Sequence, residues 1–369
     1  TSTVYGKPDN HGWLTQSTKI PQKKHAIQTH GRLFDNYASD TTYQFLINAA
    51  RGVIDTQPDL FYVNMNGRSF KYYYDQSHNI FTVPYQRVKF ANDWTIIDEN
   101  DTKFVFGVDE INSSTYYHSG DDEHASDPIN SYYTNYLSEV TTANKDSLSY
   151  EYENYSYSFK NQTSETRFVA FGVQYGCNTP PPTTTESETN IYGKRIKKIK
   201  GNNGVEINFT YGLSRQDLPN THALTGIVVK NSLTGVVLYS YTLNYGYYNS
   251  GGSTADDYRL KLLSIQKTGE KAYVFDYLGA GGIPSRPSKA QDHWGFCNKY
   301  GGNTLLPVDN ANGFYTGTSR EPVEGAAAVG TLNKITYPTG GYTLFEYESN
   351  QHVEAGVTEI LGGIRIKSI

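Results

Sequence analysis

Hydrophobic and polar residues alternate along most of the chain. Short runs rich in Tyr, Phe, Val, Ile and Thr are separated by clusters of Gly, Asn, Asp and Ser, which is the pattern of β-strands joined by turns. One short segment, YQFLINAA at residues 43–50, has the pattern of a helix. Polar stretches interrupt the strand pattern at 113–133 and 177–190, and the second has the composition of an extended linker. We therefore expect an all-β chain.

A strand–turn–strand unit recurs along this chain. Each copy has an aliphatic strand, a turn and a second strand that ends in Tyr, and all copies but the first have Gly at the turn. Such a repeat predicts a series of antiparallel β-hairpins. Two earlier segments, Val63–Asp75 and Trp94–Gly107, have the same plan, and Asn66-Gly67 marks the first turn. The copies are 137–153, 195–212, 224–246, 260–279 and 332–349, and residues 362–369 resemble the first strand of a sixth.

The aromatic residues of the second strands keep a constant phase. Residues two apart on a strand share a face, so Ile207, Phe209 and Tyr211 point the same way, as do their counterparts in the other copies. A lone hairpin is marginal in water, whereas stacked hairpins bury a continuous face. We expect Tyr211 and its counterparts to be buried in a wall. The residues expected to build this wall are Tyr150, Tyr152, Phe209, Tyr211, Phe275, Tyr277, Phe345 and Tyr347.

Several segments resemble the Rhs/YD-repeat proteins, in the divergent form found in large surface or secreted proteins of Bacteroidetes. The resemblance rests on LNKITYPTGGYTLFEYES, WTIIDENDTKFVFG and AQDHWGF, and residues 55–75 resemble the lead-in segment of those proteins. It covers roughly residues 50–369. The YD dipeptide is degraded here, and only Phe275-Asp276-Tyr277 comes near it.

The resemblance implies a long antiparallel β-sheet that spirals into a hollow shell, of which this chain is a fragment. Related shells enclose a C-terminal toxin in bacterial Rhs and insecticidal toxin-complex proteins. The implied domains are an N-terminal lead-in segment at 1–50, a β-hairpin lead-in domain at 51–135, and degenerate YD-like repeats at 136–369 that continue beyond 369. The implied location is extracellular or on the outer-membrane cell surface, often reached by type IX secretion.

The function that we expect is non-enzymatic: a shell fragment that contains or displays a C-terminal toxin or effector region. Its partners would be another protein or its own C-terminal region, together with the secretion machinery. Two alternatives stay open, a surface adhesin or glycan- or protein-binding module carried as type IX secretion cargo, and a carbohydrate-active enzyme. No catalytic, cofactor-binding or metal-binding residue is assigned, and no cofactor is expected.

Composition excludes several other classes. A net charge of −5 argues against a general nucleic-acid binder, which needs an excess of Lys and Arg. No apolar run approaches the roughly 18–20 residues of a membrane-spanning helix. The two cysteines, Cys177 and Cys297, are too few for a disulfide framework or a Cys-type zinc site, and they either pair with each other or stay free. The chain starts without Met and stops within a strand pattern at Ile369, which indicates a piece of a longer polypeptide.

Carboxylates and charged runs supply the candidate chemistry. Glycosidases need two carboxylates about 5–9.5 Å apart, and the pairs Glu346/Glu348 and Glu151/Glu153 have a suitable spacing. A polar outer face of an antiparallel sheet gives the same spacing, and we favour that interpretation. The acidic loop could bind a hard cation but lacks EF-hand spacing, as does DNANG at 309–313, so we favour a solvated loop. Its residues are Asp121, Asp122, Glu123, His124 and Asp127.

The remaining motifs have structural interpretations that we prefer. The basic run, which surrounds Ile196 and Ile199, could steer an anion, but charges on a strand also discourage edge pairing. Asp292-His293-Trp294 lacks a nucleophile, so a packed Trp beside a hydrogen-bonded His is expected. Gly279, Gly281 and Gly282 precede no helix, which argues against a phosphate cradle. The tripeptides at 40–42 and 146–148 resemble Bacteroidetes O-glycosylation sites. The basic run comprises Lys194, Arg195, Lys197, Lys198 and Lys200.

Overall fold

The computed structural model describes residues 3–6, 60–75, 78–92, 94–119, 124–125, 129–167, 182–279, 282–308 and 316–369. These residues form an all-β structure in which the named strands pair antiparallel, as the alternating pattern predicts. In these ranges no helix has both the length and the apolar character needed to cross a membrane. The chain divides into two compact units, which are described separately.

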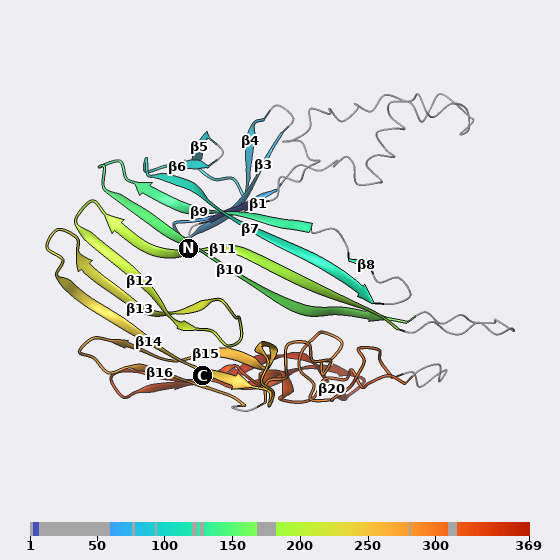
Figure 1. The fold of residues 1–369 in the computed structure, drawn as a ribbon. Coiled ribbons are helices and arrows are strands. Elements are labelled where there is room, and N and C mark those ends of the chain that lie inside the picture. The colour runs from blue at the N-terminus through green and yellow to red at the C-terminus, as the bar shows by residue number, and fades with distance from the viewer. Residues whose placement is uncertain are drawn as a thin grey trace, which may run out of the picture. The chain divides into compact units, whose positions relative to one another are not determined.

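The first unit takes residues 1–112, 131–152 and 201–203. Strands β1 to β6 lie wholly within it, and β7, β9 and β10 contribute their parts that fall in those ranges (Figure 1). Strand β1 pairs with both β2 and β9. The bounds are β1 Thr3–Gly6, β2 Phe61–Met65, β3 Arg68–Tyr74, β4 Ile80–Val83, β5 Val88–Asn92, β6 Thr95–Asp98, β7 Lys103–Ser119, β9 Ile129–Thr141 and β10 Ser147–Thr166.

Both hairpins predicted for this unit are confirmed. Asn66 and Gly67 join β2 to β3 with φ values of 47° and 74°, which is the positive-φ pair that a two-residue type I′ turn requires. Between β6 and β7, the carboxylate of Asp98 accepts hydrogen bonds from the backbone N–H groups of Asn100 and Thr102, each at 2.9 Å. Asx-type bonds of this kind fix a turn without help from packing.

The buried face of these hairpins forms the hydrophobic core of the first unit. Alternating positions of β2 and β3 point inward, and the ring of Phe61 stacks on that of Tyr72 with centroids 4.8 Å apart. Phe104 and Phe106 share one face of β7, as their spacing predicts, and both are buried. The fully buried members are Phe61, Val63, Met65, Phe70, Tyr72, Tyr74, Ile96, Phe104, Phe106 and Leu137.

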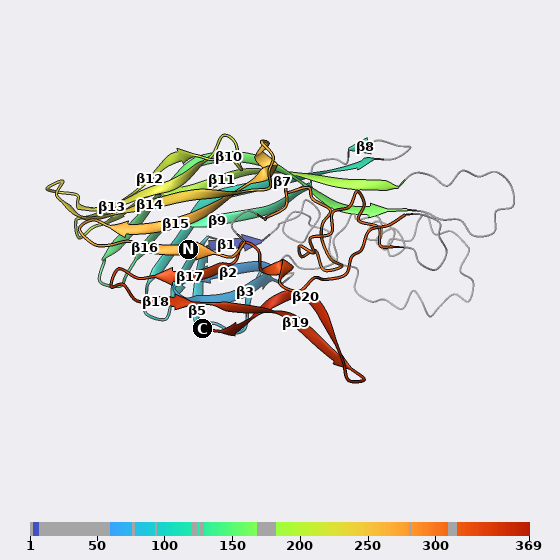
Figure 2. The same ribbon diagram turned by 90° about the horizontal axis from the view of Figure 1, so that it is seen from below.

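The second unit takes residues 113–130, 153–200 and 204–369. From β11 to β18 each strand pairs antiparallel with the next one along the chain, so the sheet is a meander (Figures 1 and 2). The last two strands form a separate two-stranded sheet, and the two-residue strand β8, His124–Ala125, pairs with β7. The bounds are β11 Thr183–Gly201, β12 Val205–Ser214, β13 His222–Asn231, β14 Val237–Asn249, β15 Tyr258–Lys267, β16 Tyr273–Tyr277, β17 Leu332–Thr336, β18 Tyr342–Leu344, β19 Glu346–Glu354 and β20 Val357–Ser368.

All five predicted repeats are hairpins. Their first and second strands are β9–β10, β11–β12, β13–β14, β15–β16 and β17–β18. Two 3₁₀ turns, Ala255–Asp257 and Ala326–Ala328, are the helical segments among the described residues. The segment between β16 and β17 is irregular, with isolated bridges Gln291–Cys297 and Pro307–Thr318.

Some predictions fall on residues outside the described ranges. These are the helix at 43–50, the tripeptide at 40–42, Cys177, Gly281, the DNANG segment at 309–313, and Asp121, Asp122, Glu123 and Asp127 of the acidic loop.

The tyrosine that ends each repeat makes the same hydrogen bond. Its hydroxyl donates to the backbone carbonyl of an aliphatic residue within the first three positions of the same repeat, over 2.6–2.8 Å. Fifteen residues separate donor and acceptor in four repeats, and twenty-one separate them in the repeat with the longer hairpin. We call these residues the repeat tyrosines; the pairs are Tyr152–Leu137, Tyr211–Ile196, Tyr245–Leu224, Tyr277–Leu262 and Tyr347–Leu332.

A register shift explains why that carbonyl accepts a side chain. Tyr277 pairs with Leu332 on the next strand, and Asn333 is skipped there because the preceding pair is Asp276 with Lys334. The same shift occurs at Tyr211, which faces Leu224, at Tyr245, which faces Leu262, and at Tyr347, which faces Ile366. A bulge interrupts the ladder and a backbone carbonyl needs a partner. The partner is the hydroxyl of the tyrosine that ends the same repeat as the carbonyl, as Tyr347 does for Leu332.

The exposure of the wall residues differs from the prediction. Tyr211, Tyr277 and Tyr347 are half-buried rather than buried, as are the other five aromatic residues named for the wall. The physical reason is that each ring lies on the sheet face, where neighbouring side chains cover it only in part; Arg195 lies over the ring of Tyr211, and Tyr248 lies edge-on to that of Tyr277. Burial raises the pKa of the repeat tyrosine Tyr152 to about 12, with a smaller contribution from Tyr150.

Candidate functional site

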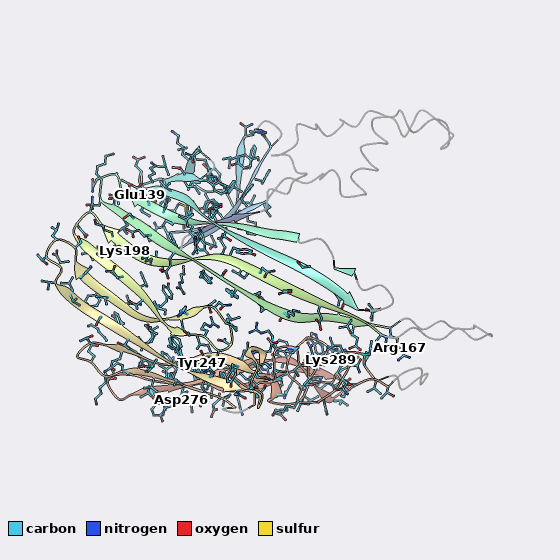
Figure 3. The ribbon with its side chains drawn as sticks, viewed as in Figure 1. Glu139, Arg167, Lys198, Tyr247, Asp276 and Lys289 are labelled. Atoms are coloured by element: carbon cyan, nitrogen blue, oxygen red, sulfur yellow. The ribbon has the colours of Figure 1, made fainter. Side chains whose placement is uncertain are left out.

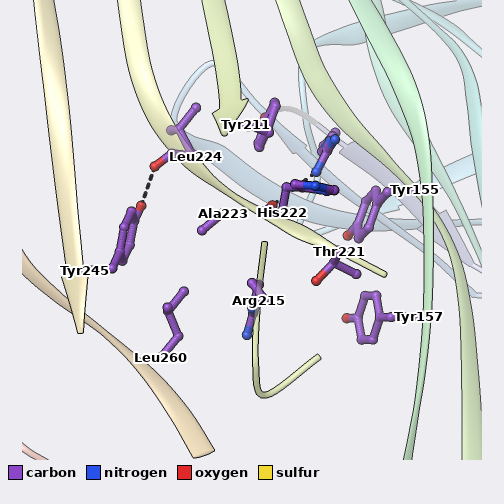
Figure 4. A pocket seen from close by; sticks show the side chains of 11 residues that line it. Tyr155, Tyr157, Tyr211, Arg215, Thr221, His222, Ala223, Leu224, Tyr245 and Leu260 are labelled. Atoms are coloured by element: carbon purple, nitrogen blue, oxygen red, sulfur yellow. Dashed lines mark hydrogen bonds between the residues drawn. The ribbon is translucent and has the colours of Figure 1, made fainter. Parts of the chain in front are cut away.

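A groove opens on the second unit, lined by side chains from the six strands β10 to β15 and from the loop between β12 and β13 (Figure 4). Its volume is about 300 Å³, and its lining mixes aromatic rings, guanidinium groups and short apolar side chains. Figure 4 shows Tyr155 and Tyr157 side by side along one strand. The lining residues are Tyr155, Tyr157, Arg195, Tyr211, Arg215, Thr221, His222, Ala223, Leu224, Tyr245 and Leu260.

Arg195 links three neighbouring strands at this groove. Its guanidinium lies 4.0 Å from the ring centroid of Tyr211 on β12 and 5.7 Å from that of Tyr155 on β10. Both distances are within the roughly 6 Å range of cation–π attraction. The same guanidinium pairs with Glu153 at 2.6 Å and donates to the backbone carbonyl of His222 at 3.1 Å. Arg195 is therefore held from four sides.

Aromatic rings continue this contact along β10. Tyr155 and Tyr157 have centroids 5.8 Å apart and planes inclined by 17°, and Phe159 follows 6.1 Å beyond Tyr157 at 22°. The guanidinium of Arg286 lies 5.4 Å from the Phe159 centroid. Cationic and aromatic groups thus form a continuous arginine–aromatic row, which comprises Tyr211, Arg195, Tyr155, Tyr157, Phe159 and Arg286.

A second arginine is fixed at the other side of the groove. Arg215 makes two hydrogen bonds to the carboxylate of Asp217, at 3.0 and 2.7 Å, and Asp217 also accepts from the N–H of Leu260. Burial alone would raise the pKa of Asp217, but the hydrogen bonds from Arg215 and Leu260 hold it below its ordinary value. Asp217 therefore stays ionised, and Arg215 stays in place beside the groove.

Members of the basic run contact side chains of neighbouring strands, and two of them, Arg195 and Lys198, face carboxylates. Arg195 pairs with Glu153, Lys194 donates to the side chain of Asn154 at 2.6 Å, and Lys198 lies 3.8 Å from Glu206. Figure 3 labels Lys198 towards the hairpin end of β11. These contacts favour the interpretation as charges on a paired strand over that of an anion-steering patch.

The carboxylate pair of the last hairpin is also engaged. Glu346 accepts a hydrogen bond from the hydroxyl of Ser368, and Glu348 pairs with Arg365, each at 2.6 Å. Both contacts run across to β20 and tie the strands of one hairpin together. The polar-face interpretation accounts for them.

The structure corrects the prediction for Trp294. Its side chain is 57% exposed rather than packed, although a Cβ at Gly362 would come within 2.6 Å of its ring. Asp292 is buried instead, and its carboxylate accepts the backbone N–H groups of Trp294 and Phe296. The ring of His293 lies 4.0 Å from Glu321. DHWGF is thus a turn built around the aspartate.

The other motifs lie in structural roles. Gly279 has a φ of +68°, and a Cβ there would meet Val329 at 2.8 Å, so a tight turn requires this glycine. Ser147 of the tripeptide at 146–148 is half-buried and pairs with Thr141. Cys297 is a half-buried free cysteine. Within the described ranges, no group of three His, Cys, Asp or Glu residues is placed to hold a metal ion.

Sequence reasoning missed the groove, although one signal was present. A second alternation, of Tyr155, Tyr157 and Phe159, follows the tyrosine that ends the first repeat and has the opposite phase, so it marks an aromatic face that the repeat itself does not require. The partners of this face lie too far along the chain for a spacing argument, because Arg195 follows Glu153 by 42 residues.

No protein-family model matches the chain, and no curated protein matches it in sequence. Among solved structures, the chain is similar to one in the crystal structure of TcdB2-TccC3-Cdc42, with 8% sequence identity and a TM-score of 0.30. The match covers 85% of this chain and 15% of that one. Membership of the Rhs/YD-repeat family is therefore a proposal, and the all-β hairpin architecture is what the structure shows.

Proposed function

We propose that this chain is a section of the wall of an Rhs/YD-like β-shell, exported to the cell surface, which contains or displays a C-terminal region of the same polypeptide. In this role the chain is non-enzymatic. Its mechanism is exclusion: a continuous sheet with paired edges keeps solvent and proteases away from what it covers.

The observation that carries the proposal is the linked series of repeat tyrosines. Leu262 illustrates it, because it faces Tyr245 of one repeat and accepts the hydroxyl of Tyr277 from its own. Leu332 does the same between Tyr277 and Tyr347. The repeats at 224–246, 260–279 and 332–349 are therefore each fastened to the strand before them and to the strand after them, as an extended wall requires.

The series makes a prediction about the longer polypeptide. Ile366 faces Tyr347 across the last register shift, where Lys367 is skipped, so it occupies the place of an opening aliphatic residue. If the wall continues, a tyrosine follows Ile366 at the fifteen-residue spacing of the shorter repeats. A continuing sequence with neither that tyrosine nor a turn before it would contradict the proposal.

Containment is tested by protease protection. The full polypeptide, including whatever follows Ile369, is digested with a non-specific protease, and the survival of its C-terminal region is followed by mass spectrometry. We expect that region to be cut much more slowly than the same region produced alone. Equal rates would contradict containment. A C-terminal region that is stable by itself could also resist the protease. Electron microscopy of the same sample distinguishes the two explanations, because containment predicts a hollow particle.

The absence of enzymatic activity is tested with the carboxylates. If Glu346 and Glu348 only tie β19 to β20, the Glu346→Gln and Glu348→Gln variants change stability without changing turnover of any glycan. A glycan that wild-type protein hydrolyses and these variants do not would revive the carbohydrate-active enzyme.

A further inference from the structure

The shape and lining of the groove in the second unit suit a ligand with flat apolar faces and polar edges. Tyr155 and Tyr157 present nearly parallel rings on one strand, and Leu224, Ala223 and Leu260 add short apolar surface. Concave sites of this kind bind small ligands through apolar area and orient them with a few polar groups. The about 300 Å³ of the groove matches one or two small rings rather than a folded partner.

Charge balance narrows the ligand class. Each arginine of the groove and its row has a carboxylate partner: Arg195 has Glu153 at 2.6 Å, Arg215 has Asp217 at 2.7 Å, and Arg286 has Asp256 at 3.6 Å. An anionic ligand would have to displace one of these carboxylates and leave it partly buried without its partner, which is costly. The groove therefore favours an uncharged ligand.

The polar groups that remain are suited to hydroxyls. Arg195 and Arg215 line the groove and keep 20% and 26% of their side chains exposed while paired, and the exposed His222 also lies at the lining; each of these side chains carries N–H groups. Carbohydrates combine such hydroxyl edges with C–H faces that carry partial positive charge, which the negative face of an aromatic ring attracts. A purely apolar ligand would leave these N–H groups unpaired.

We propose that this groove binds an uncharged oligosaccharide, with sugar C–H faces against Tyr155 and Tyr157 and hydroxyls at Arg215 and His222. The proposal is independent of the containment role, since a wall functions with or without a glycan site.

The binding test uses defined probes and the intact chain. Cellohexaose, maltohexaose, xylohexaose and chitohexaose are titrated by calorimetry, with heparin and polygalacturonate as anionic comparisons. We expect at least one neutral probe to bind, with an affinity that hardly changes between about 0.05 and 0.5 M salt, because screening acts on charges. Binding of anionic probes alone, or of none, overturns the proposal, and so does saturable binding of a protein partner that neutral sugars fail to displace.

Variants then locate the site. Tyr157→Ala removes a ring of the groove and should weaken the bound probe about tenfold or more, whereas Tyr157→Phe keeps the ring and should retain most of the affinity. His222→Ala removes an exposed side chain but keeps the backbone carbonyl that accepts a hydrogen bond from Arg195. It should fold and bind the probe more weakly, so it tests the site even if Tyr157→Ala unfolds. Tyr192→Ala, on β11 and 60% exposed outside the groove, is the matched control. Equal affinity in Tyr192→Ala, His222→Ala and wild type, with all three folded by near-ultraviolet circular dichroism, places binding elsewhere.

Discussion

The hydroxyl of Tyr277 on β16 donates a 2.8 Å hydrogen bond to the backbone carbonyl of Leu262 on β15. Leu262 precedes Leu263, which has no partner in the pairing of β14 with β15. The tyrosine hydroxyl therefore gives the Leu262 carbonyl a hydrogen-bond donor at a point where the strand ladder is interrupted. The hydrogen bond recurs in every repeat and supplies the first test.

Tyr277→Phe removes this hydroxyl and keeps the ring. The Leu262 carbonyl then loses a partner in a half-covered position, which should lower the free energy of unfolding by about 1–2 kcal/mol. The measurement is urea unfolding followed by circular dichroism. Tyr273→Phe, in the same strand and 43% exposed, is the control and should stay within about 0.5 kcal/mol of wild type. Equal effects of the two substitutions would contradict the role of the hydrogen bond.

Alkaline pH should weaken the second unit through Tyr248. This side chain is 4% exposed, and burial, with a smaller effect of Tyr277, raises its pKa to about 12 from 10.0. The fold favours the neutral phenol, so its contribution is complete below about pH 10 and disappears as the pH rises through about 12. Unfolding free energies of wild type and Tyr248→Phe should therefore converge across this window. Tyr85→Phe, 82% exposed, should instead run parallel to wild type.

Replacement of Arg195 by lysine should be costly although it keeps the charge. An ammonium group cannot stack on Tyr211 and Tyr155 while it pairs with Glu153, so we expect a loss of about 1–2 kcal/mol in unfolding free energy. Lys194→Gln, next to it on the same strand, loses the contact with Asn154 and serves as control. A double-mutant cycle with Glu153→Gln separates the ion pair from the ring contacts; additive effects in the cycle would mean that the ion pair contributes nothing.

Glu165 should hold the irregular segment after β16 against β10. Its carboxylate is 6% exposed and accepts hydrogen bonds from Thr304, the N–H of Leu305 and Lys289, at 2.8, 2.8 and 3.2 Å. Burial by itself would raise its pKa, but these bonds hold the pKa below its ordinary value. Its contribution is therefore present above the ordinary carboxyl pKa and disappears as the pH falls through the lowered one.

Limited proteolysis measures that anchoring. Glu165→Gln should speed cleavage within residues 282–308 at neutral pH, and acidification should do the same for wild type. Glu270→Gln, which loses only a surface pair with Lys267, should leave the cleavage pattern unchanged. Cleavage of the segment at wild-type rate in Glu165→Gln would show that the contacts do not restrain it.

Much of the fold follows from local pattern. The strand alternation and the turn residues correctly predicted where the hairpins lie. They do so because Asn66-Gly67 and the glycines of the later turns determine the conformation of only a few neighbouring residues. The phase of Phe104 and Phe106 likewise predicted one buried face, and both are in the core. These features depend on neighbours in the sequence, which is why the sequence reveals them.

Features that depend on pairing between repeats were not predictable in this way. The register shift opposite Tyr211 arises from its fit to β13, and the half-burial of its ring follows from that geometry. The contacts of Arg195 involve residues of three other strands. The basic run in the sequence therefore does not reveal that Arg195 makes ordered cation–π contacts. Trp294 was expected to pack, but it is exposed and Asp292 is buried instead. The carboxylate of Asp292 accepts two backbone N–H groups and so fixes the turn.

The hydrogen bond from Tyr245 to Leu224 spans twenty-one residues instead of fifteen, yet it joins the same two structural positions. The extra residues extend the tip of the β13–β14 hairpin, where Leu233 is 86% exposed. Length can therefore vary at the tips while the joints between repeats stay the same. A protein built in this way can acquire new surface loops one hairpin at a time, and inserting an epitope at residues 232–236 is the natural way to tag or redirect it without disturbing its scaffold.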